Sequence, residues 1–210
     1  YTGRLNNDGE QLLITGGGPD PIHDFTYNDQ LPWPAEADGD GASLILSNPA
    51  AGPPHGEPAS WTASRHLGGS PGSAEPAALT YTAWAALNGI KGEPNDDDDR
   101  DGLSNYWEFL FGSRPDLASD DPVFGLAVRS LDVDGKVDDY LFLSFRKNLN
   151  ANASLTVEIS SDLITWSSDP DMIKPVSKDD NGDSTATVTF RFARPIGQGQ
   201  SQAFVRLRGN

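Results

Sequence analysis

Short stretches in which apolar and polar residues alternate occur along most of the chain and predict mainly β structure. They are bounded by Gly, Pro, Asn and Asp, the residues that favour turns. Strands this short, separated by frequent turns, are typical of β-sandwiches, so we expect one β-rich segment at each end of the chain. The predicted strands lie at residues 11–15, 22–27, 42–46, 124–128, 139–146, 155–160, 185–192 and 203–207.

Between the two β-rich segments the spacing of apolar residues changes to that of helices. A first helix is predicted to begin after Thr80 and to end at Gly89. A second is predicted over residues 105–111, and we expect Trp84 and Trp107 to form a small core that holds the two helices together. The predicted apolar faces are Tyr81, Trp84, Ala85 and Leu87 in the first helix, and Trp107, Leu110 and Phe111 in the second.

Composition supports a turn-rich β protein and excludes chemistry that depends on cysteine. The chain has 22 glycines and 16 prolines among 210 residues, more than helix bundles use. It has no cysteine, which excludes disulfides, thiolate metal sites and sulfur redox chemistry. No apolar run approaches the roughly 18 residues that span a bilayer, and no signal peptide is visible. We expect a mature fragment of a longer protein.

The net charge of −16 is unevenly distributed. Residues 1–121 are strongly acidic, whereas residues 122–210 carry nearly equal numbers of acidic and basic side chains. This shift predicts a boundary at 121/122. Together with the change to helical spacing after residue 76, it divides the chain into three predicted segments: residues 1–76, 77–121 and 122–210. A field this negative repels nucleic acid and anionic membranes, so we expect neither as a partner.

The strongest motif is a twelve-residue stretch, 97–108, that has the pattern of an EF-hand-like calcium-binding loop. Gly102 stands where such a loop turns sharply. Four successive carboxylates, Asp96 to Asp99, repel one another by roughly 1 kcal/mol per pair, so an ordered chain needs a cation there. The alternative is a solvated acidic linker. The predicted ligands are the carboxylates of Asp97, Asp99, Asp101 and Glu108, the main-chain carbonyl of Leu103 and the side-chain amide of Asn105.

The first segment resembles the second half of a lamin-tail-like domain. The matching motifs are residues 3–10, 25–29, 32–34, 38–44 and 69–72, in the same order. The resemblance implies an immunoglobulin-type β-sandwich, a structural or binding role and no catalytic residues. Bacterial copies occur in large secreted proteins. Because the first strands of such a domain would precede Tyr1, we expect an open sheet edge that another copy or segment completes.

The helical segment resembles a dockerin-like or thrombospondin-type-3-like calcium repeat. Residues 101–105 and 111–116 carry this resemblance. A single copy argues against a dockerin that binds cohesin. Residues 161–166 resemble a motif found at the C-terminal ends of secreted bacterial proteins that contain such repeats, and the last segment resembles a fibronectin-type sandwich. Together these resemblances imply a secreted or cell-surface bacterial protein.

Other candidate sites are weaker. His23, His55 and His66 have no metal or catalytic spacing, so we expect no catalysis. Tyr27, Trp33 and Trp61 could stack on sugar rings, although we favour burial of the two tryptophans. We expect Trp166 in the core. Residues 179–183 could bind a second cation, but we favour a hairpin turn because no carboxylate follows at position 12.

The leading hypothesis is therefore a non-catalytic, calcium-stabilised structural or adhesive region. It has two immunoglobulin- or fibronectin-like β-sandwich segments joined by a helix–calcium loop–helix. One alternative is a carbohydrate-binding accessory module of a polysaccharide-degrading enzyme. The other is a subunit of an extracellular filament completed by strand addition.

Overall fold

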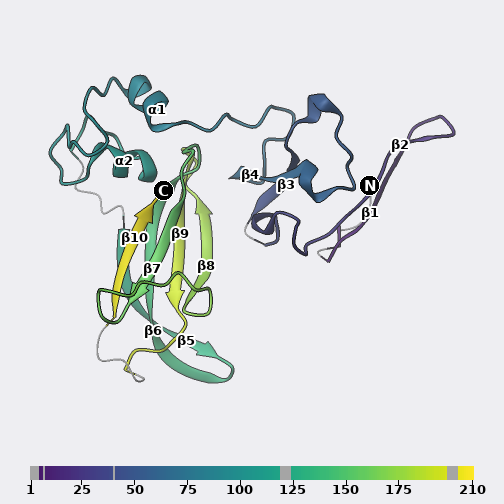
Figure 1. The fold of residues 1–210 in the computed structure, drawn as a ribbon. Coiled ribbons are helices and arrows are strands. Elements are labelled where there is room, and N and C mark those ends of the chain that lie inside the picture. Colours follow the sequence, from purple (N-terminus) through teal and green to yellow (C-terminus); the bar gives the residue numbers. More distant parts are fainter. Residues whose placement is uncertain (1–4, 7, 40, 119–123, 198–202) are drawn as a thin grey trace. The chain divides into compact units, whose positions relative to one another are not determined.

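The computed structural model describes residues 5–6, 8–39, 41–118, 124–197 and 203–210 (Figure 1). Within these ranges it contains ten strands and two α-helices, and the fold is mainly β, as predicted. The chain divides into two compact units, Tyr1–Pro76 and Ala77–Asn210, which we call unit 1 and unit 2. None of the described helices is both long enough and apolar enough to cross a membrane.

Unit 1 consists of two antiparallel strand pairs connected by short 3-10 helices. β1 (Glu10–Thr15) pairs with β2 (Pro21–Tyr27), and β3 (Ala42–Leu46) pairs with β4 (Trp61–Leu67). The sequence did not predict β4, because it follows a Pro/Gly/Ser-rich stretch and has few apolar residues. The 3-10 helices are Ala35–Ala37, Pro49–Ala51 and Pro58–Ser60.

The interior of unit 1 is a small aromatic cluster. Trp33 is buried, and its ring lies 6.3 Å from that of Trp61. Trp61 stacks on Phe25 at 5.4 Å, and its indole N–H donates a hydrogen bond to the carbonyl of His55. The favoured expectation of a buried tryptophan is therefore met for Trp33, while Trp61 is half-buried. An indole buried in this way leaves no ring face for a ligand at Trp33.

The two predicted helices form in unit 2. α1 (Tyr81–Asn88) begins after Thr80, whose hydroxyl oxygen accepts a hydrogen bond from the N–H of Ala83, and ends at Gly89 with φ +70°. α2 (Asn105–Phe111) ends at Gly112 in the same left-handed conformation.

One predicted position of the first helix is wrong. Leu87 is 74% exposed, whereas Trp84 and Ala85 are buried. Leu87 follows Trp84 by three residues, but it lies six residues from Tyr81, so it is rotated away from the buried face.

Unit 2 also contains two antiparallel sheets. One has the strand order β5-β6-β9-β8, and the other consists of β10 and β7. β8 was not predicted, because Pro175 interrupts its pattern and the pairing shifts there. The strands are β5 (Phe124–Val133), β6 (Lys136–Asn148), β7 (Leu155–Ser160), β8 (Ile173–Asp180), β9 (Thr185–Phe192) and β10 (Phe204–Gly209).

Helix α2 joins the two hydrophobic clusters of unit 2. Phe111 belongs to a cluster with buried residues of β6, β7, β8 and β9, so both sheets share this core. Phe109 and Leu110 belong to the other cluster, with Trp84 of α1. Trp107 packs against both clusters. The amide of Asn148 in β6 donates a hydrogen bond to the carbonyl of Phe109 at 2.9 Å.

The boundary that the charge shift predicted at 121/122 lies inside unit 2. Leu79 forms a bridge with Ala151, and the helices pack on residues of the sheets. The helical segment is therefore part of the β unit rather than a separate connector. Charge reports which residues meet solvent, whereas buried apolar contacts determine which segments form one unit. The predicted boundary after residue 76 coincides with the division between the two units.

Candidate metal centre

Three aspartates of the acidic loop, residues 97–108, come together. One oxygen each of Asp97, Asp99 and Asp101 lies within 4.8 Å of the others. Within the described ranges, this is the one group of three or more acidic, His or Cys side chains arranged to hold a metal. Two oxygens 2.3–2.6 Å from a calcium ion are at most about 5 Å apart, so the spacing suits that ion.

Local hydrogen bonds fix the loop in this shape. The two oxygens of Asp97 accept hydrogen bonds from the N–H groups of Arg100 (2.7 Å) and Gly102 (3.0 Å). Asp101 accepts one from Leu103 at 2.8 Å. Arg100 and Gly102 have φ of +67° and +98°, and glycine at the second position allows the sharp turn. The loop is thus folded by its own side chains.

Glu108 supplies the second observation at this centre. Its side chain projects from the first turn of α2 and is 0% exposed, and neither carboxylate oxygen has a hydrogen-bond partner. Burial, followed by the charges of Asp99 and Asp101, raises the pKa of Glu108 to about 8. The folded chain without a cation therefore disfavours the charged form of Glu108. A buried carboxylate in this state needs a proton or a cation.

A further buried oxygen points to the same need. Oδ2 of Asp99 has no hydrogen-bond partner, and burial raises the pKa of this carboxyl group. Two different side chains, one in the loop and one in the helix, therefore have buried oxygens that protein donors leave unsatisfied. In native proteins such groups usually have a bound ion or water as partner.

Asn105, predicted as a ligand through its side-chain amide, also makes hydrogen bonds within the protein. Its side chain is fully buried, and its amide oxygen accepts a hydrogen bond from the N–H of Asp98 at 3.3 Å. Its amide nitrogen donates to the carbonyl of Glu93 at 3.2 Å. Asn105 therefore holds the segment before the loop against α2, and its amide oxygen is already engaged.

Leu103, predicted as a ligand through its main-chain carbonyl, has its side chain packed against the larger hydrophobic cluster. This packing connects the loop to the core of both sheets. The described side chains support four of the predicted ligands, Asp97, Asp99, Asp101 and Glu108, while ligation by the Leu103 carbonyl and the Asn105 amide stays a prediction.

Sequence reasoning missed two residues that shape the centre. A Cβ atom at Gly92 would lie 2.3 Å from Oδ1 of Asp98 and 2.8 Å from the amide nitrogen of Asn105. Tyr81 of α1 donates a hydrogen bond to the Gly92 carbonyl at 3.3 Å. The segment before the loop therefore passes close to both helices. No motif marks Gly92, because its role depends on this close approach.

The four side chains that the structure supports are all carboxylates, which favours a hard divalent cation. Calcium accepts irregular oxygen geometry, whereas magnesium requires a stricter octahedron and retains more water. The residues present therefore fit a calcium ion.

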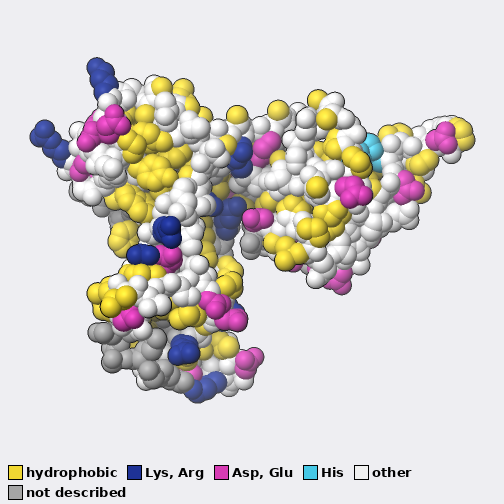
Figure 2. Space-filling model, in the orientation of Figure 1, with side chains coloured by type: hydrophobic (Ala, Val, Ile, Leu, Met, Phe, Trp, Pro, Cys, Tyr) yellow, Lys and Arg dark blue, Asp and Glu magenta, His cyan; other side chains and the backbone are white. Residues whose placement is uncertain are grey.

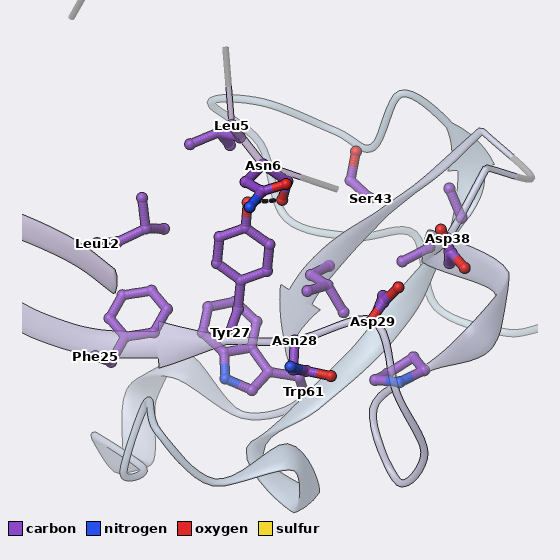
Figure 3. A pocket seen from close by; sticks show the side chains of 14 residues that line it. Leu5, Asn6, Leu12, Phe25, Tyr27, Asn28, Asp29, Asp38, Ser43 and Trp61 are labelled. Carbon is purple, nitrogen blue, oxygen red and sulfur yellow. Dashed lines mark hydrogen bonds between the residues drawn. The ribbon is translucent and has the colours of Figure 1, made fainter. Parts of the chain in front are cut away.

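In unit 1 the structure brings Tyr27 and Trp61 to a common cavity of about 510 Å³ (Figure 3). Asn28, Asp29 and Asp38 add polar groups to its lining. The phenol of Tyr27 donates a hydrogen bond to the carbonyl of Asn6, and Trp61 lies behind it. Trp33 is not among the lining residues.

Residues 179–183 include the end of β8 and most of the turn to β9, in agreement with the favoured hairpin. Asp180 accepts a hydrogen bond from the N–H of Gly182, and Asp183 pairs with Arg146 at 2.8 Å. Protein donors thus satisfy these carboxylates.

Three further expectations concern single residues. Trp166 is half-buried rather than in the core, with the guanidinium of Arg206 4.1 Å above its ring. The rings of His23 and His55 lie 4.5 Å apart, a proximity that their spacing in sequence does not indicate. The expected open sheet edge near Tyr1 lies outside the described residues.

Comparison of the chain with protein-family models, curated protein sequences and solved structures gives no significant match, so its function is inferred from the residues and their geometry.

Proposed function

We propose that this chain is a non-catalytic, calcium-stabilised structural or adhesive region of a secreted or cell-surface bacterial protein. A calcium ion bound by Asp97, Asp99, Asp101 and Glu108 stabilises unit 2. The observation that carries this proposal is the pair of buried, unpartnered oxygens of Glu108 beside three clustered aspartates. The bacterial, extracellular setting rests on the resemblance of the loop and of residues 161–166 to segments of secreted proteins.

The position of α2 explains how an ion would stabilise the whole unit. Glu108 is followed by Phe109 and Leu110, which are buried against α1, and by Phe111, which lies in the core shared by both sheets. A cation that neutralises Glu108 and binds the loop aspartates therefore acts on the helix that both cores contain. Our sequence-based hypothesis of a joint between two sandwiches becomes that of an ion bound within one unit.

Unfolding of the full chain in 1 mM calcium and in chelator tests the proposal. An ion at 100 times its Kd adds about 2.7 kcal/mol to the stability of the state that binds it. Hydrogen–deuterium exchange with mass spectrometry reads residues 81–111 separately from unit 1. We expect slower exchange there in calcium, and a smaller effect of magnesium. Identical unfolding and identical exchange in calcium and chelator would overturn the proposal.

Glu108→Gln and Asp179→Asn form the matched pair for this experiment. Glu108→Gln removes the charge at nearly constant volume, so we expect it to lose most of the calcium effect while unit 2 still folds. Asp179→Asn removes an acidic side chain from the β8–β9 turn region and should retain the full effect. Equal calcium responses of the two variants would exclude Glu108 as a ligand.

Carbohydrate binding by unit 1 is a second candidate function, which the cavity lined by Tyr27 and Trp61 favours. An aromatic ring can stack on a sugar, while Asn28, Asp29 and Asp38 could bind its hydroxyl groups. Affinity electrophoresis in gels containing cellulose derivatives, xylan or pectin tests this function. We expect Asp29→Asn to weaken retardation and Glu36→Gln, an exposed residue outside the cavity, to leave it unchanged. Absence of retardation in all gels counts against this function.

A further inference from the structure

The edge strand β5 exposes apolar side chains on the face that should be covered. In the pairing of β5 with β6, Phe124 is opposite Phe145, and Leu126 is opposite Leu143. Residues paired in this way lie on the same face of a sheet. Phe145 and Leu143 are each 3% exposed, whereas Phe124 and Leu126 are 54% and 56% exposed. The core-facing side of β5 is therefore uncovered in the described structure.

The smaller sheet explains this exposure, because it has two strands facing a sheet of four. β10 pairs with β7 on one side, and its other side is an edge. Between β10 and β5 lies a groove of about 380 Å³, whose apolar lining includes Leu126, Leu143, Val205 and Leu207. In the face drawn in Figure 2, hydrophobic side chains gather over α2, near the C-terminal end of β10.

We propose that this groove binds an extended acidic peptide segment, which pairs with the free edge of β10 as a third strand of the smaller sheet. Main-chain hydrogen bonds to β10 would give affinity, and alternate apolar side chains would cover Leu126 and Phe124. A segment of about six to eight residues matches the six residues of β10.

The charges on β10 select the chemistry of the partner. Arg206 and Arg208 alternate with Val205 and Leu207 and therefore lie on the outer face of the strand. They share a single carboxylate, Glu158, at 2.5 and 3.8 Å, so this outer face has more positive than negative charge. An added strand would place alternate side chains next to these arginines, and Asp or Glu would complement them.

The groove is also connected to the acidic loop, and this part of the inference rests on the proposed function. Gly102 and Leu103 of the loop and Trp107 of α2 form one wall of the groove. Calcium bound at Asp101 and Glu108 would fix the residues that directly precede and follow this wall in the sequence. Peptide binding and calcium binding should therefore strengthen each other, by the same factor in both directions.

A synthetic fluorescein-labelled peptide of eight residues, alternating valine and glutamate, is the probe. Its binding to the full chain is measured by fluorescence anisotropy in 1 mM calcium and in chelator. We expect saturable binding in calcium, at least tenfold weaker in chelator, and weaker when lysine replaces every glutamate. Leu126→Asp should weaken binding at least tenfold. Val137→Asp changes another exposed apolar residue, in β6 and outside the groove, and should leave binding unchanged.

Calcium binding, measured separately by calorimetry without peptide, distinguishes the two proposals. Calcium binding without peptide binding overturns the groove proposal alone. Peptide binding that Leu126→Asp does not weaken also overturns it, since the peptide then binds elsewhere. Absence of calcium binding overturns the proposed function and the coupling, whereas peptide binding of equal strength in calcium and chelator overturns the coupling. Calcium-dependent dimers that Leu126→Asp dissociates would identify a second copy as the occupant and contradict the peptide proposal.

Discussion

Unit 2 contains two loops in which a carboxylate has opposite surroundings. In the first, residues 97–108, Glu108 is buried without any hydrogen-bond donor, and its pKa is raised to about 8. In the second, residues 160–165, Asp162 accepts hydrogen bonds from the N–H groups of Ile164 and Thr165 at 2.8 and 2.7 Å. These donors lower the pKa of Asp162 to about 2.

The difference lies in the supply of donors rather than in the number of acidic residues. The Asp162 turn, residues 160–165, has main-chain N–H groups and the Ser160 hydroxyl directed at one carboxylate. The acidic loop uses its N–H groups on Asp97, Asp99 and Asp101, and none reaches Glu108. A carboxylate with donors is stable as an anion by itself, whereas one without donors requires a cation or a proton.

The largest difference between the two loops is expected when the core beneath the acidic loop is removed. Phe109 is 1% exposed and lies 5.5–6.0 Å, ring to ring, from Trp84, Tyr81 and Tyr106. We expect Phe109→Ala to lower the free energy of unfolding by about 3–5 kcal/mol, because it leaves a cavity under α2. Ile164→Ala, in the Asp162 turn, should change it by less than about 0.5 kcal/mol, since Ile164 is 83% exposed. Urea titration measures the free energy of unfolding of both variants. Equal changes would contradict the assignment of Phe109 to a core beneath the acidic loop.

The opposite pKa shifts predict opposite pH dependences. Without a cation, folded unit 2 retains a proton on Glu108 between pH 4.5 and about 8, whereas the unfolded chain releases it. Since the folded state binds more protons in this window, its stability should fall as pH rises, by roughly 3 kcal/mol between pH 5 and 8. Urea unfolding in chelator at these two pH values measures this slope.

Glu108→Gln is the control for this pH dependence and should abolish the part of the slope that belongs to Glu108. Asp162 acts in a separate window. Because its pKa is lowered in the folded state, its stabilisation is present above about pH 4 and is lost as pH falls through about 2. If wild type and Glu108→Gln have the same slope between pH 5 and 8, the assignment of the raised pKa is wrong.

The smallest effect is expected for Asp162→Ala. It removes the acceptor for Ile164 and Thr165, but both N–H groups lie in an exposed turn where water can replace it. We expect Tm to fall by about 2–4 °C, with the full calcium response retained. Differential scanning calorimetry with and without calcium measures both quantities. A lost calcium response would show that the two loops are not independent.

The elements that could be predicted from sequence are those that local rules determine. Both helices occur at the predicted places because Thr80 caps one helix and glycines end both. Six predicted strands reappear with bounds that differ by at most two residues, among them β3, β7 and β9 without any difference. β4 and β8 were missed because prolines and polar residues obscure their alternation, and pairing with a neighbouring strand compensates.

Within the acidic loop, too, local sequence predicts some features and misses those that depend on distant segments. Spacing in sequence was enough to group Asp97, Asp99 and Asp101, because a short loop brings nearby residues together whatever surrounds it. Spacing did not indicate that the amide of Asn105 forms hydrogen bonds with Asp98 and Glu93. It also gave no signal for Gly92, which matters only because distant segments pass close to it.

The sequence by itself determined a mainly β chain, two capped helices and a cluster of three carboxylates, since each depends on residues a few positions apart. Only the tertiary structure decided that α2 lies within the cores of both sheets, that Glu108 is buried without a donor, and that β5 leaves an apolar face open. Burial is a property of the whole unit: it depends on which distant segments exclude water from a side chain, and no local pattern contains that information.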